Sequence, residues 1–462
     1  MFGSLLSFYQ DYEMPLARVF FEIEKRGVAV DPAKLDELRR YVNAELAKSC
    51  AAASGVIGRA VAPSTAEAVA LGEGTLNLGS PAQLLVEFKR LGLKVPRNRK
   101  TGKESTGEDQ LNVMFAETGH PFLREILRVR ELNKVLGTYV NAKLANNILY
   151  ASYVVTGTVT GRRSSRANFL GLGTNHQNLP KHSDLGRMFR RCIVARPGKI
   201  FVAGDQDQAE DWIVQAIIAD NSGGTSGLDE LRAGVDRHQK LASFIFSRPA
   251  DECGKGTPFR FYGKKTRHAG NYGMAGNRLS AELAKEGFHI NRQQCEFFLT
   301  KFHESEPSIR GVFQRYVERE ISAKRFLRTP FGRERCFFGC RPYGDNSSVF
   351  RDAYSYIPQS TVGDNTGLAI LYFEGSYPGL VVMDLHDEVV LEVPDSVSAV
   401  IPAADQLRKA FDREIRFPNG TTIVIPTGFK IGYNLRDVAE CGKYSEAGLL
   451  RTYNTLNQLP RA

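Results

Sequence analysis

The side chains best placed to do chemistry are two aspartates far apart in the sequence. Asp387 lies in a Leu-His-Asp-Glu run between two apolar segments, 381–383 and 389–393, which predict a pair of strands with Asp387 at or beside the hairpin turn. Asp205 follows another strand-like segment, 199–203. Carboxylates held at rigid strand ends could converge on two magnesium ions, the arrangement that phosphoryl transfer uses. Taken alone, the His-Asp-Glu run is more often a solvated acidic turn.

The segment 264–273 predicts a helix with one chemically distinctive face. Lys264, His268, Asn271 and Tyr272 lie near one side of such a helix, so a cation, an imidazole, an amide and an aromatic ring point the same way. A nucleoside triphosphate suits this set, because the charge matches its phosphates and the ring matches its base. The alternative is a solvated basic helix beside a glycine-rich turn.

Two polar segments, 158–165 and 175–180, combine hydroxyls, amides and arginines. They could line the minor groove of a nucleic acid, whose acceptors all base pairs share. They could equally be polar loops without a ligand.

Composition limits the class of protein. A chain of 462 residues can bury several cores, so two to four subdomains are expected. The net charge of +10 suits a polyanionic partner without proving one. Seven dispersed cysteines favour a reducing compartment over a disulfide framework. No apolar run approaches the ~18 residues that span a bilayer, and the N-terminus lacks the basic flank of a secretory signal. We therefore expect a soluble, intracellular protein with no membrane partner.

Helical periodicity predicts the elements around these segments. Helices are expected over 12–25, from Pro32 onward and over 122–144, and 228–323 should be mostly helical. The strand-like segments lie on both sides of that helical region. This order predicts an α+β core split by an inserted helical subdomain.

In their order and spacing, these segments resemble family A DNA polymerases, the group of bacterial DNA polymerase I and many phage replicative enzymes. The first palm motif of the family, Asp-x-Ser-Gln-x-Glu, resembles 205–210; its fingers-helix motif resembles 264–273; and its last palm motif is His-Asp-Glu at 386–388. Supporting matches are Thr160-Gly161-Arg162, Gln177-Asn178-Leu179-Pro180, Asp236-x-His238, Thr329-Pro330-Phe331-Gly332-Arg333, Arg351 with Gln359, and Lys134-x3-Thr138-Tyr139. The resemblance covers nearly the whole chain, and we expect a phage-type member consisting of the polymerase region.

The resemblance implies a template-directed DNA polymerase of replication or repair, which adds deoxynucleotides to a primer 3′-hydroxyl by a two-metal mechanism. Two Mg²⁺ ions, with Mn²⁺ as a substitute, would be held by Asp205, Asp387 and the carbonyl of Gln206. Catalytic residues would be Asp205, Asp387, Glu388 and His268. The incoming nucleotide would meet Gln208, Glu210, His238, Lys264, His268 and Tyr272, with Glu210 filling the space of a ribose 2′-hydroxyl. Primer and template would meet Lys134, Arg162, Asn178, Arg351, Gln359 and His386.

The resemblance also implies a right-hand architecture, with an antiparallel-sheet palm, helical fingers and a helical thumb. Its expected parts are an N-terminal helical segment packing on the palm (1–32), the thumb (33–148), the palm (149–220 and 349–462) and the fingers (221–348). In the family, a proofreading exonuclease domain on the order of 150–200 residues usually precedes this region. The first polymerase-like helix begins near Tyr12 here. The expectation is therefore a chain without its own exonuclease, with proofreading absent, supplied by a separate protein or lost. Its expected partners are primer–template DNA, deoxynucleotides and a separate exonuclease or replisome protein, in the cytoplasm of a bacterium or a phage-infected host.

Several positions depart from the family pattern. They are Lys264 for Arg, His268 for Lys, Asp207 for Ser, Asp211-Trp212 for Leu-Arg, Gly276 for a second tyrosine and Ser355 for Asn. At strand periodicity, Asp207 could share a face with Asp205 and add a third carboxylate. His268 could protonate the departing pyrophosphate, only bind phosphate or only pack against the fingers, or Arg267 could be the phosphate ligand instead. These departures concern nucleotide selectivity and leave both metal-binding aspartates in place.

Two other functions are compatible with parts of this residue pattern. A single-subunit RNA polymerase shares the palm chemistry, but the bulky acid Glu210 would exclude ribonucleotides. A catalytically inactive, polymerase-like DNA-binding protein is disfavoured because Asp205 and Asp387 are both present.

Overall fold

A five-stranded antiparallel sheet forms the centre of the computed structural model, which describes residues 2–98, 102–181, 183–341 and 344–458. The strand order is β11-β12-β8-β15-β16. The strands are β8 (Lys199–Gln206), β11 (Val381–Asp384), β12 (Glu388–Pro394), β15 (Thr427–Gly432) and β16 (Val438–Lys443). The α+β class predicted from the sequence is confirmed, and the two apolar segments near the C-terminus form the predicted strand pair.

The sheet separates two hydrophobic cores. Ile200 and Val202 of β8 belong to a core that includes residues of α9, α17 and α18, whereas Phe201 and Ala203 belong to a core shared with α7 and α8. Successive side chains of a strand point to opposite faces, so one strand serves both cores. This burial on both faces explains why the segment is almost continuously apolar.

Helices of the N- and C-terminal parts cover the sheet. These are α2 (Met14–Arg26), α8 (Asp184–Cys192), α9 (Ala209–Ser222), α17 (Tyr356–Ser376), α18 (Val397–Phe411) and α19 (Glu446–Gln458). The helix predicted over 12–25 corresponds to α2 and the π-helical turn before it. It packs against α17, where Arg26 forms a two-pronged ion pair with Glu374 at 2.8 and 2.9 Å.

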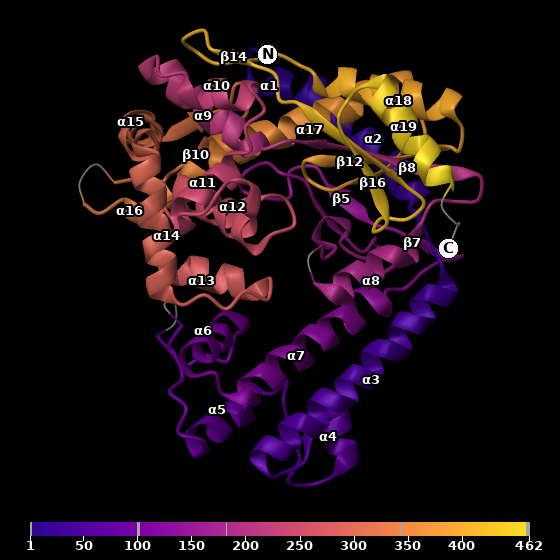
Figure 1. Ribbon diagram of the computed structural model, residues 1–462, viewed down its shortest axis with the longest axis vertical. Helices are drawn as coiled ribbons and strands as arrows, with labels where there is room; N and C mark the ends of the chain where they lie inside the picture. Colours follow the sequence, from indigo (N-terminus) through magenta and orange to yellow (C-terminus); the bar gives the residue numbers. More distant parts are fainter. Residues whose placement is uncertain (1, 99–101, 182, 342–343, 459–462) are drawn as a thin grey trace.

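Two long helices, α3 (Pro32–Ile57) and α7 (Pro121–Val135), run side by side away from the sheet (Figure 1). Asp31 caps α3 by accepting hydrogen bonds from the next two free N–H groups, as the Asp-Pro pair predicted. The far end carries α4 (Thr65–Leu71) and α5 (Pro81–Arg90), and α6 (Glu108–Thr118) lies between α5 and α13 (Figure 1).

The helix predicted over 122–144 is shorter than expected. It ends at Val135 and continues only as the π-helical turn Leu136–Val140. The Lys143 carbonyl accepts a hydrogen bond from the N–H of Gly173 at 2.7 Å. This long-range bond replaces the helical pairing that the apolar periodicity alone predicted.

The middle of the chain is helical, as predicted. Its helices are α10 (Ser226–Arg232), α11 (Arg237–Phe246), α12 (Pro258–Asn271), α13 (Gly276–Lys285), α14 (Arg292–Ser305), α15 (Arg315–Lys324) and α16 (Ser347–Tyr354). The other strands are short and form small separate sheets. In one of them, β1 (Val28–Val30) pairs with β4 (Ile148–Leu149) and β7 (Ile193–Val194). The remaining pairs are β2 (Val61–Ala62) with β3 (Leu76–Asn77), β5 (Ser152–Val154) with β6 (Ser164–Arg166), β9 (Phe326–Arg328) with β10 (Glu334–Cys336), and β13 (Ile415–Arg416) with β14 (Thr422–Ile423). Within the described ranges, no helix has the length and apolar character needed to cross a membrane.

Candidate active site

Asp387 lies in the tight turn that joins β11 to β12. The turn is closed by a hydrogen bond from the N–H of Leu385 to the carbonyl of Glu388 at 2.8 Å. His386 has a φ of +77°, in the left-handed region that residues other than glycine seldom adopt. A strained residue of this kind is retained when its surroundings hold it, and such residues concentrate at functional sites.

Strand β8 brings Asp205 to the same end of the sheet. Glu388 pairs directly with Asp205 across β12 and β8, so their side chains share a face. The N–H of Gln206 donates to the carbonyl of Asp387 at 3.2 Å, which fixes the turn against the end of β8. The convergence of the two predicted aspartates therefore follows from strand register.

The carboxylates at this sheet end repel one another. Burial, followed by the charges of Asp387 and Glu388, raises the pKa of Asp205 to about 6. Burial also raises the pKa of Asp387. Two cations counter the repulsion: Lys430 lies 3.1 Å from Asp205, and Lys181 lies 2.7 Å from Glu388. Burial alone would raise the pKa of Glu388, but these lysines outweigh it and lower that pKa to about 2.

The sequence analysis missed both lysines. The one signal for Lys430 is a charged residue inside an otherwise apolar strand, 427–432, and nothing in the sequence connects it to Asp205 across 225 positions. Lys181 directly follows the polar segment 175–180, and its partner is 207 positions away.

The two aspartates suit magnesium that the substrate helps to hold. In the described part of the chain, no group of three or more His, Cys, Asp or Glu side chains is arranged to hold a metal ion. Magnesium is usually bound by one or two carboxylates together with substrate phosphates, so a complete protein cage is not required. Burial first, and then the charges of Asp387 and Glu388, raise the pKa of Asp205, and a bound cation would favour its ionised form.

The structure restricts how Gln206 and Asp207 could act as metal ligands. The Gln206 side chain is buried and bonded to Thr366 and Asn365 at 2.8 and 2.7 Å, so only its main-chain carbonyl is suited to a metal. The third carboxylate expected from Asp207 does not join the pair. Strand β8 ends at Gln206, and the N–H of Asp207 bonds to the carbonyl of Pro426, so the two-residue alternation stops one position too early.

Helix α12 presents part of the predicted nucleotide face to this site, but Asn271 of that face is buried. Lys264 and His268 reach solvent, and Tyr272 ends the helix with its ring edge-on to His268 at 4.8 Å. Burial lowers the pKa of Lys264, against the opposing pull of Asp387 and Asp205. The negative charges of both candidate metal ligands therefore act on the Lys264 ammonium group.

Glu210, at the start of α9, connects three of the predicted residues. It pairs with Arg162, accepts a hydrogen bond from the Tyr272 hydroxyl, and lies 3.4 Å from Nε2 of His268. Burial would raise the pKa of Glu210, but Arg162 and His268 outweigh it and hold that pKa far below its usual range. The structure thus brings Glu210, which is expected to exclude the ribose 2′-hydroxyl, into contact with residues expected to meet the nucleotide and the primer.

The Gln208 side chain is bonded within the protein, whereas Nδ1 of His238 is buried and has no hydrogen-bond partner among the described residues. The Gln208 amide accepts from the N–H of Arg237 at 3.1 Å and donates to the carbonyl of Val235 at 3.3 Å. Burial, then the charge of Arg267, lowers the pKa of His238 to about 3. Arg267 itself is only 2% exposed, so the alternative in which it serves as the phosphate ligand is wrong for this conformation.

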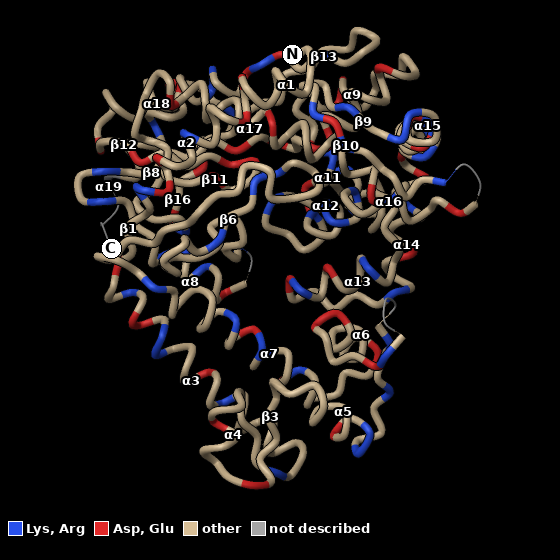
Figure 2. The backbone as a smooth tube through the Cα atoms, turned by 180° about the vertical axis from the view of Figure 1, so that it is seen from behind, with Lys and Arg blue, Asp and Glu red and all other residues tan. Residues whose placement is uncertain are grey.

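A cavity of about 760 Å³ lies beside the sheet end, between α6, α7, the start of α8 and the segment after α13. Lys134 and Asn178, both predicted to contact DNA, line it together with the basic side chains Arg124, Arg128, Arg130, Lys181, Arg187 and Lys285. Acidic residues are interspersed among basic ones along these elements (Figure 2). Helix α6 meets the α13 region through a 3.0 Å ion pair of Asp109 with Lys285 and an edge-on contact of Phe115 with His289.

Arg351 lies elsewhere. It lines a second cavity of about 680 Å³ with Gly273, at the end of α12, and with Tyr354. Gln359 is half-buried on α17. The structure therefore does not place Arg351 in the same cavity as Lys134 and Asn178.

The fold is similar to a solved polymerase structure, the POL domain of Pol1 from M. smegmatis in complex with DNA primer-template and dNTP. The TM-score is 0.73 at 23% identity, covering 93% of this chain and 71% of that one. Residues 47–434 match the model of DNA polymerase family A, and the chain belongs to that family.

Curated relatives agree with the family. The chain is 31% identical over 406 residues to the thermostable DNA polymerase I of Thermus filiformis, covering 85% of this chain and 44% of the relative. It is 29% identical over 327 residues to DNA polymerase I of Mycobacterium tuberculosis, covering 69% and 33%. The chain thus spans less than half the length of these relatives. They are bacterial, so the expectation of a phage-type member stays a prediction.

Proposed function

We propose that this chain is a template-directed DNA polymerase, which joins deoxynucleotides to the 3′-hydroxyl of a DNA primer. The observation that carries the proposal is the meeting of Asp205 and Asp387 at one sheet end, within electrostatic reach of Lys264 on α12. The reaction attaches the primer oxygen to the α-phosphorus of the nucleotide and releases pyrophosphate. Carboxylates on one side and a cationic helix on the other match the charges of that reaction.

Two magnesium ions, or manganese in their place, would be held by Asp205, Asp387 and the main-chain carbonyl of Gln206. When bound, the metal ions would supply Lewis acidity for the primer hydroxyl and charge neutralisation for the triphosphate. Glu388 would stay ionised beside them, because Lys181 and Lys430 keep its pKa low.

Residues around Glu210 would bind and select the nucleotide. Lys264 would bind the phosphates and Tyr272 would pack against the base or sugar. His268 would donate a proton from Nε2 to the departing pyrophosphate. Glu210 would occupy the volume that a ribose 2′-hydroxyl requires, which disfavours the RNA polymerase alternative.

Primer and template would occupy the cavity between α7 and α13. Lys134 and Asn178 line that cavity. Arg162 and His386 would contact the primer end, whereas Arg351 and Gln359 would act nearer the template. In this proposal, 33–148 is the thumb, 221–348 the fingers, and 149–220 with 349–462 the palm, on which 1–32 packs.

Primer extension by the 462-residue chain tests the function. Extension with deoxynucleotides, dependent on added magnesium and lost in Asp205→Ala and Asp387→Ala, is expected. Primer–template affinity of both variants should stay within a few-fold of the native value, because neither side chain is placed in the DNA cavity. DNA binding without extension at any magnesium concentration would instead indicate the inactive DNA-binding alternative.

A further inference from the structure

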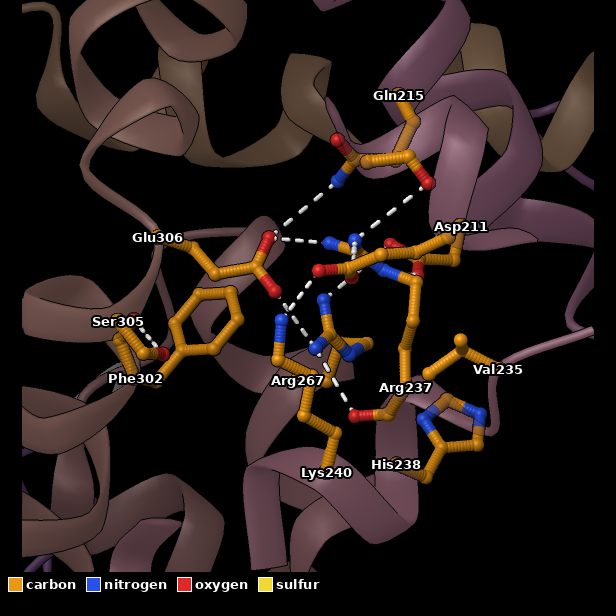
Figure 3. A network of polar contacts seen from close by, with 12 residues as sticks. Asp211, Gln215, Val235, Arg237, His238, Lys240, Arg267, Phe302, Ser305 and Glu306 are labelled. Carbon is orange, nitrogen blue, oxygen red and sulfur yellow. Dashed lines mark hydrogen bonds and ion pairs between the residues drawn. The ribbon is translucent and has the colours of Figure 1, made fainter. Parts of the chain in front are cut away.

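The first turn of α9 presents two consecutive carboxylates to α12. Glu210 lies 3.4 Å from His268, and its neighbour Asp211 lies 3.5 Å from Arg267. Adjacent acids on one helix therefore face adjacent basic residues on the other. Glu210 belongs to the candidate nucleotide site, whereas Asp211 points into a buried polar network (Figure 3).

That network joins four helices. Arg237 of α11 bonds to Asp211 at 2.8 Å and to Glu306, at the end of α14, at 2.5 Å. Arg267 of α12 bonds to the other oxygen of Glu306 at 2.7 Å and to the carbonyl of Arg237 at 3.0 Å. Asp211 and both arginines are only 2–3% exposed. Figure 3 shows the two arginines side by side between the two acids.

One link of the network is incomplete. Nη1 of Arg267 and Oδ1 of Asp211 are 3.5 Å apart, beyond the usual hydrogen-bond range of roughly 2.7–3.2 Å. Among the described residues, neither atom has a hydrogen-bond partner, and neither does Nε of Arg267. Buried charged groups left unpaired are unfavourable. A movement of α12 toward α9 by a few tenths of an ångström would complete the bond.

Two links join α9 to the group formed by α11, α12 and α14: the complete bond of Arg237 to Asp211 and the incomplete one of Arg267 to Asp211. A Cβ on Gly263 of α12 would lie 2.3 Å from the His238 carbonyl on α11, and one on Gly270 would lie 2.1 Å from the Phe302 ring on α14. These close approaches hold α11, α12 and α14 together. Asp211 belongs instead to α9, which packs against α17 beneath the sheet.

Stability alone does not explain the charges. A buried ion-pair network is often matched or exceeded in stability by apolar side chains of similar volume. Asp211 also stands where the family pattern has Leu. A role in fixing one arrangement of α12 on α9 explains why four charged side chains occupy a position suited to an apolar contact.

We propose that Asp211 and Arg267 are positioning residues for the incoming nucleotide. Their bond is completed when α12 approaches α9, which brings Lys264 and His268 to their working positions around Glu210. The inference rests on the proposed polymerase function and deepens it, because it assigns nucleotide positioning to two residues that do not touch the nucleotide.

Single-turnover incorporation measured against dNTP concentration tests the proposal. Arg267→Met should raise the half-saturating dNTP concentration by about tenfold or more and leave primer–template affinity within about twofold. Arg267→Lys keeps the charge but cannot bridge Asp211 and Glu306 at once, so it should show the same direction with less loss of stability. The double variant Asp211→Asn with Arg267→Met should raise the half-saturating dNTP concentration by less than the product of the two single-variant factors, because both changes remove the link of Arg267 to Asp211, although Asp211→Asn also weakens the pair with Arg237.

Arg26→Met is the matched control. It removes the ion pair with Glu374, which joins α2 to α17, so it should lower thermal stability without changing the dNTP dependence. An unchanged half-saturating concentration in both Arg267 variants, or fully additive effects in the double variant, would overturn the proposal.

A measurement independent of activity separates this proposal from the polymerase function. Backbone amides of α12 should exchange hydrogen faster in Arg267→Lys than in the native chain or in Arg26→Met. If the native chain fails to extend primers, the proposed function is wrong, and the exchange result still decides whether Arg267 positions α12. Equal exchange in all three proteins would contradict the positioning role.

Discussion

Asp205 on β8 and Glu388 on β12 stand directly opposite each other and share one cation, Lys430. Its Nζ lies 3.1 Å from Asp205 and 3.8 Å from Glu388. In this arrangement the Lys430 ammonium group supplies part of the positive charge that a divalent cation would bring to the two carboxylates. The pKa of Asp205 stays raised even so, because burial and the charges of Asp387 and Glu388 outweigh the effect of the lysine.

Magnesium should stabilise the folded protein through Asp205 and Asp387. A ligand that binds only the folded state at 100 times its dissociation constant adds about 2.7 kcal/mol. We therefore expect magnesium to raise the melting temperature of the native chain, and to do so far less in Asp205→Asn and Asp387→Asn. Calorimetric melting with and without magnesium checks this, with calcium as a second cation. An equal rise in the native chain and in both variants would place the binding site elsewhere.

Lys430→Met should have opposite effects without and with magnesium. Without the metal, loss of the only cation within 4 Å of Asp205 among the described residues should lower the melting temperature. With the competing lysine gone, the magnesium concentration for half-maximal stabilisation should fall. Lys443→Met, on the exposed edge strand β16, is the control and should change neither quantity. A higher magnesium requirement in Lys430→Met would show that the lysine assists metal binding.

Glu210→Ala should admit ribonucleotides. The change opens space at the predicted gate and frees the Tyr272 hydroxyl, so the ratio of deoxynucleotide to ribonucleotide incorporation should fall by at least about tenfold. Glu318→Ala is a matched control, because it removes a similar hydrogen bond from a tyrosine, Tyr354, in the cavity that Arg351 lines and not at the predicted gate. A ratio that falls equally in both variants, or in neither, would contradict the gate role.

His176 should make folding sensitive to acid. It is 1% exposed, and burial lowers its pKa to about 4, from 6.5 in an exposed histidine. Above pH 6.5 the residue is neutral in both states and its contribution is fully present. As the pH falls from 6.5 toward 4, His176 becomes protonated in the unfolded chain but stays neutral in the folded chain. The free energy of unfolding therefore falls, by up to roughly 3 kcal/mol. Denaturant unfolding across that range should be less pH-dependent in His176→Gln, and an unchanged slope would contradict the prediction.

Much of the candidate site was predictable because its signals are local. The apolar segments on either side of Asp387 predicted a hairpin, and the structure has it. The cluster of Lys264, His268 and Tyr272 required only helical geometry, and α12 provides it. The predicted third carboxylate failed at Asp207, because the end of a strand is set by its neighbours, here Pro426, and not by its own alternation.

Interactions between residues far apart in the sequence could not be predicted from it. The register of β12, β8 and β15 brings Lys430 to Asp205 and Glu388, and no single segment encodes that register. Lys181 reaches Glu388 from the segment before α8, through tertiary packing. The pairing of Asp211 with Arg267 depends in the same way on how α9 and α12 pack. The sequence showed both residues as charged and gave no sign that they are buried together.

The sequence by itself determined which chemical groups the chain carries and which short elements hold them, because hydrophobic periodicity and turn residues act over a few positions. Only the tertiary structure decided that Asp205 is paired with Lys430, that Glu210 is bound by Arg162 and Tyr272, and that Arg267 faces inward. The physical reason is that ionisation depends on burial and on charges within a few ångströms. Those neighbours come from strand register and helix packing between segments tens to hundreds of residues apart.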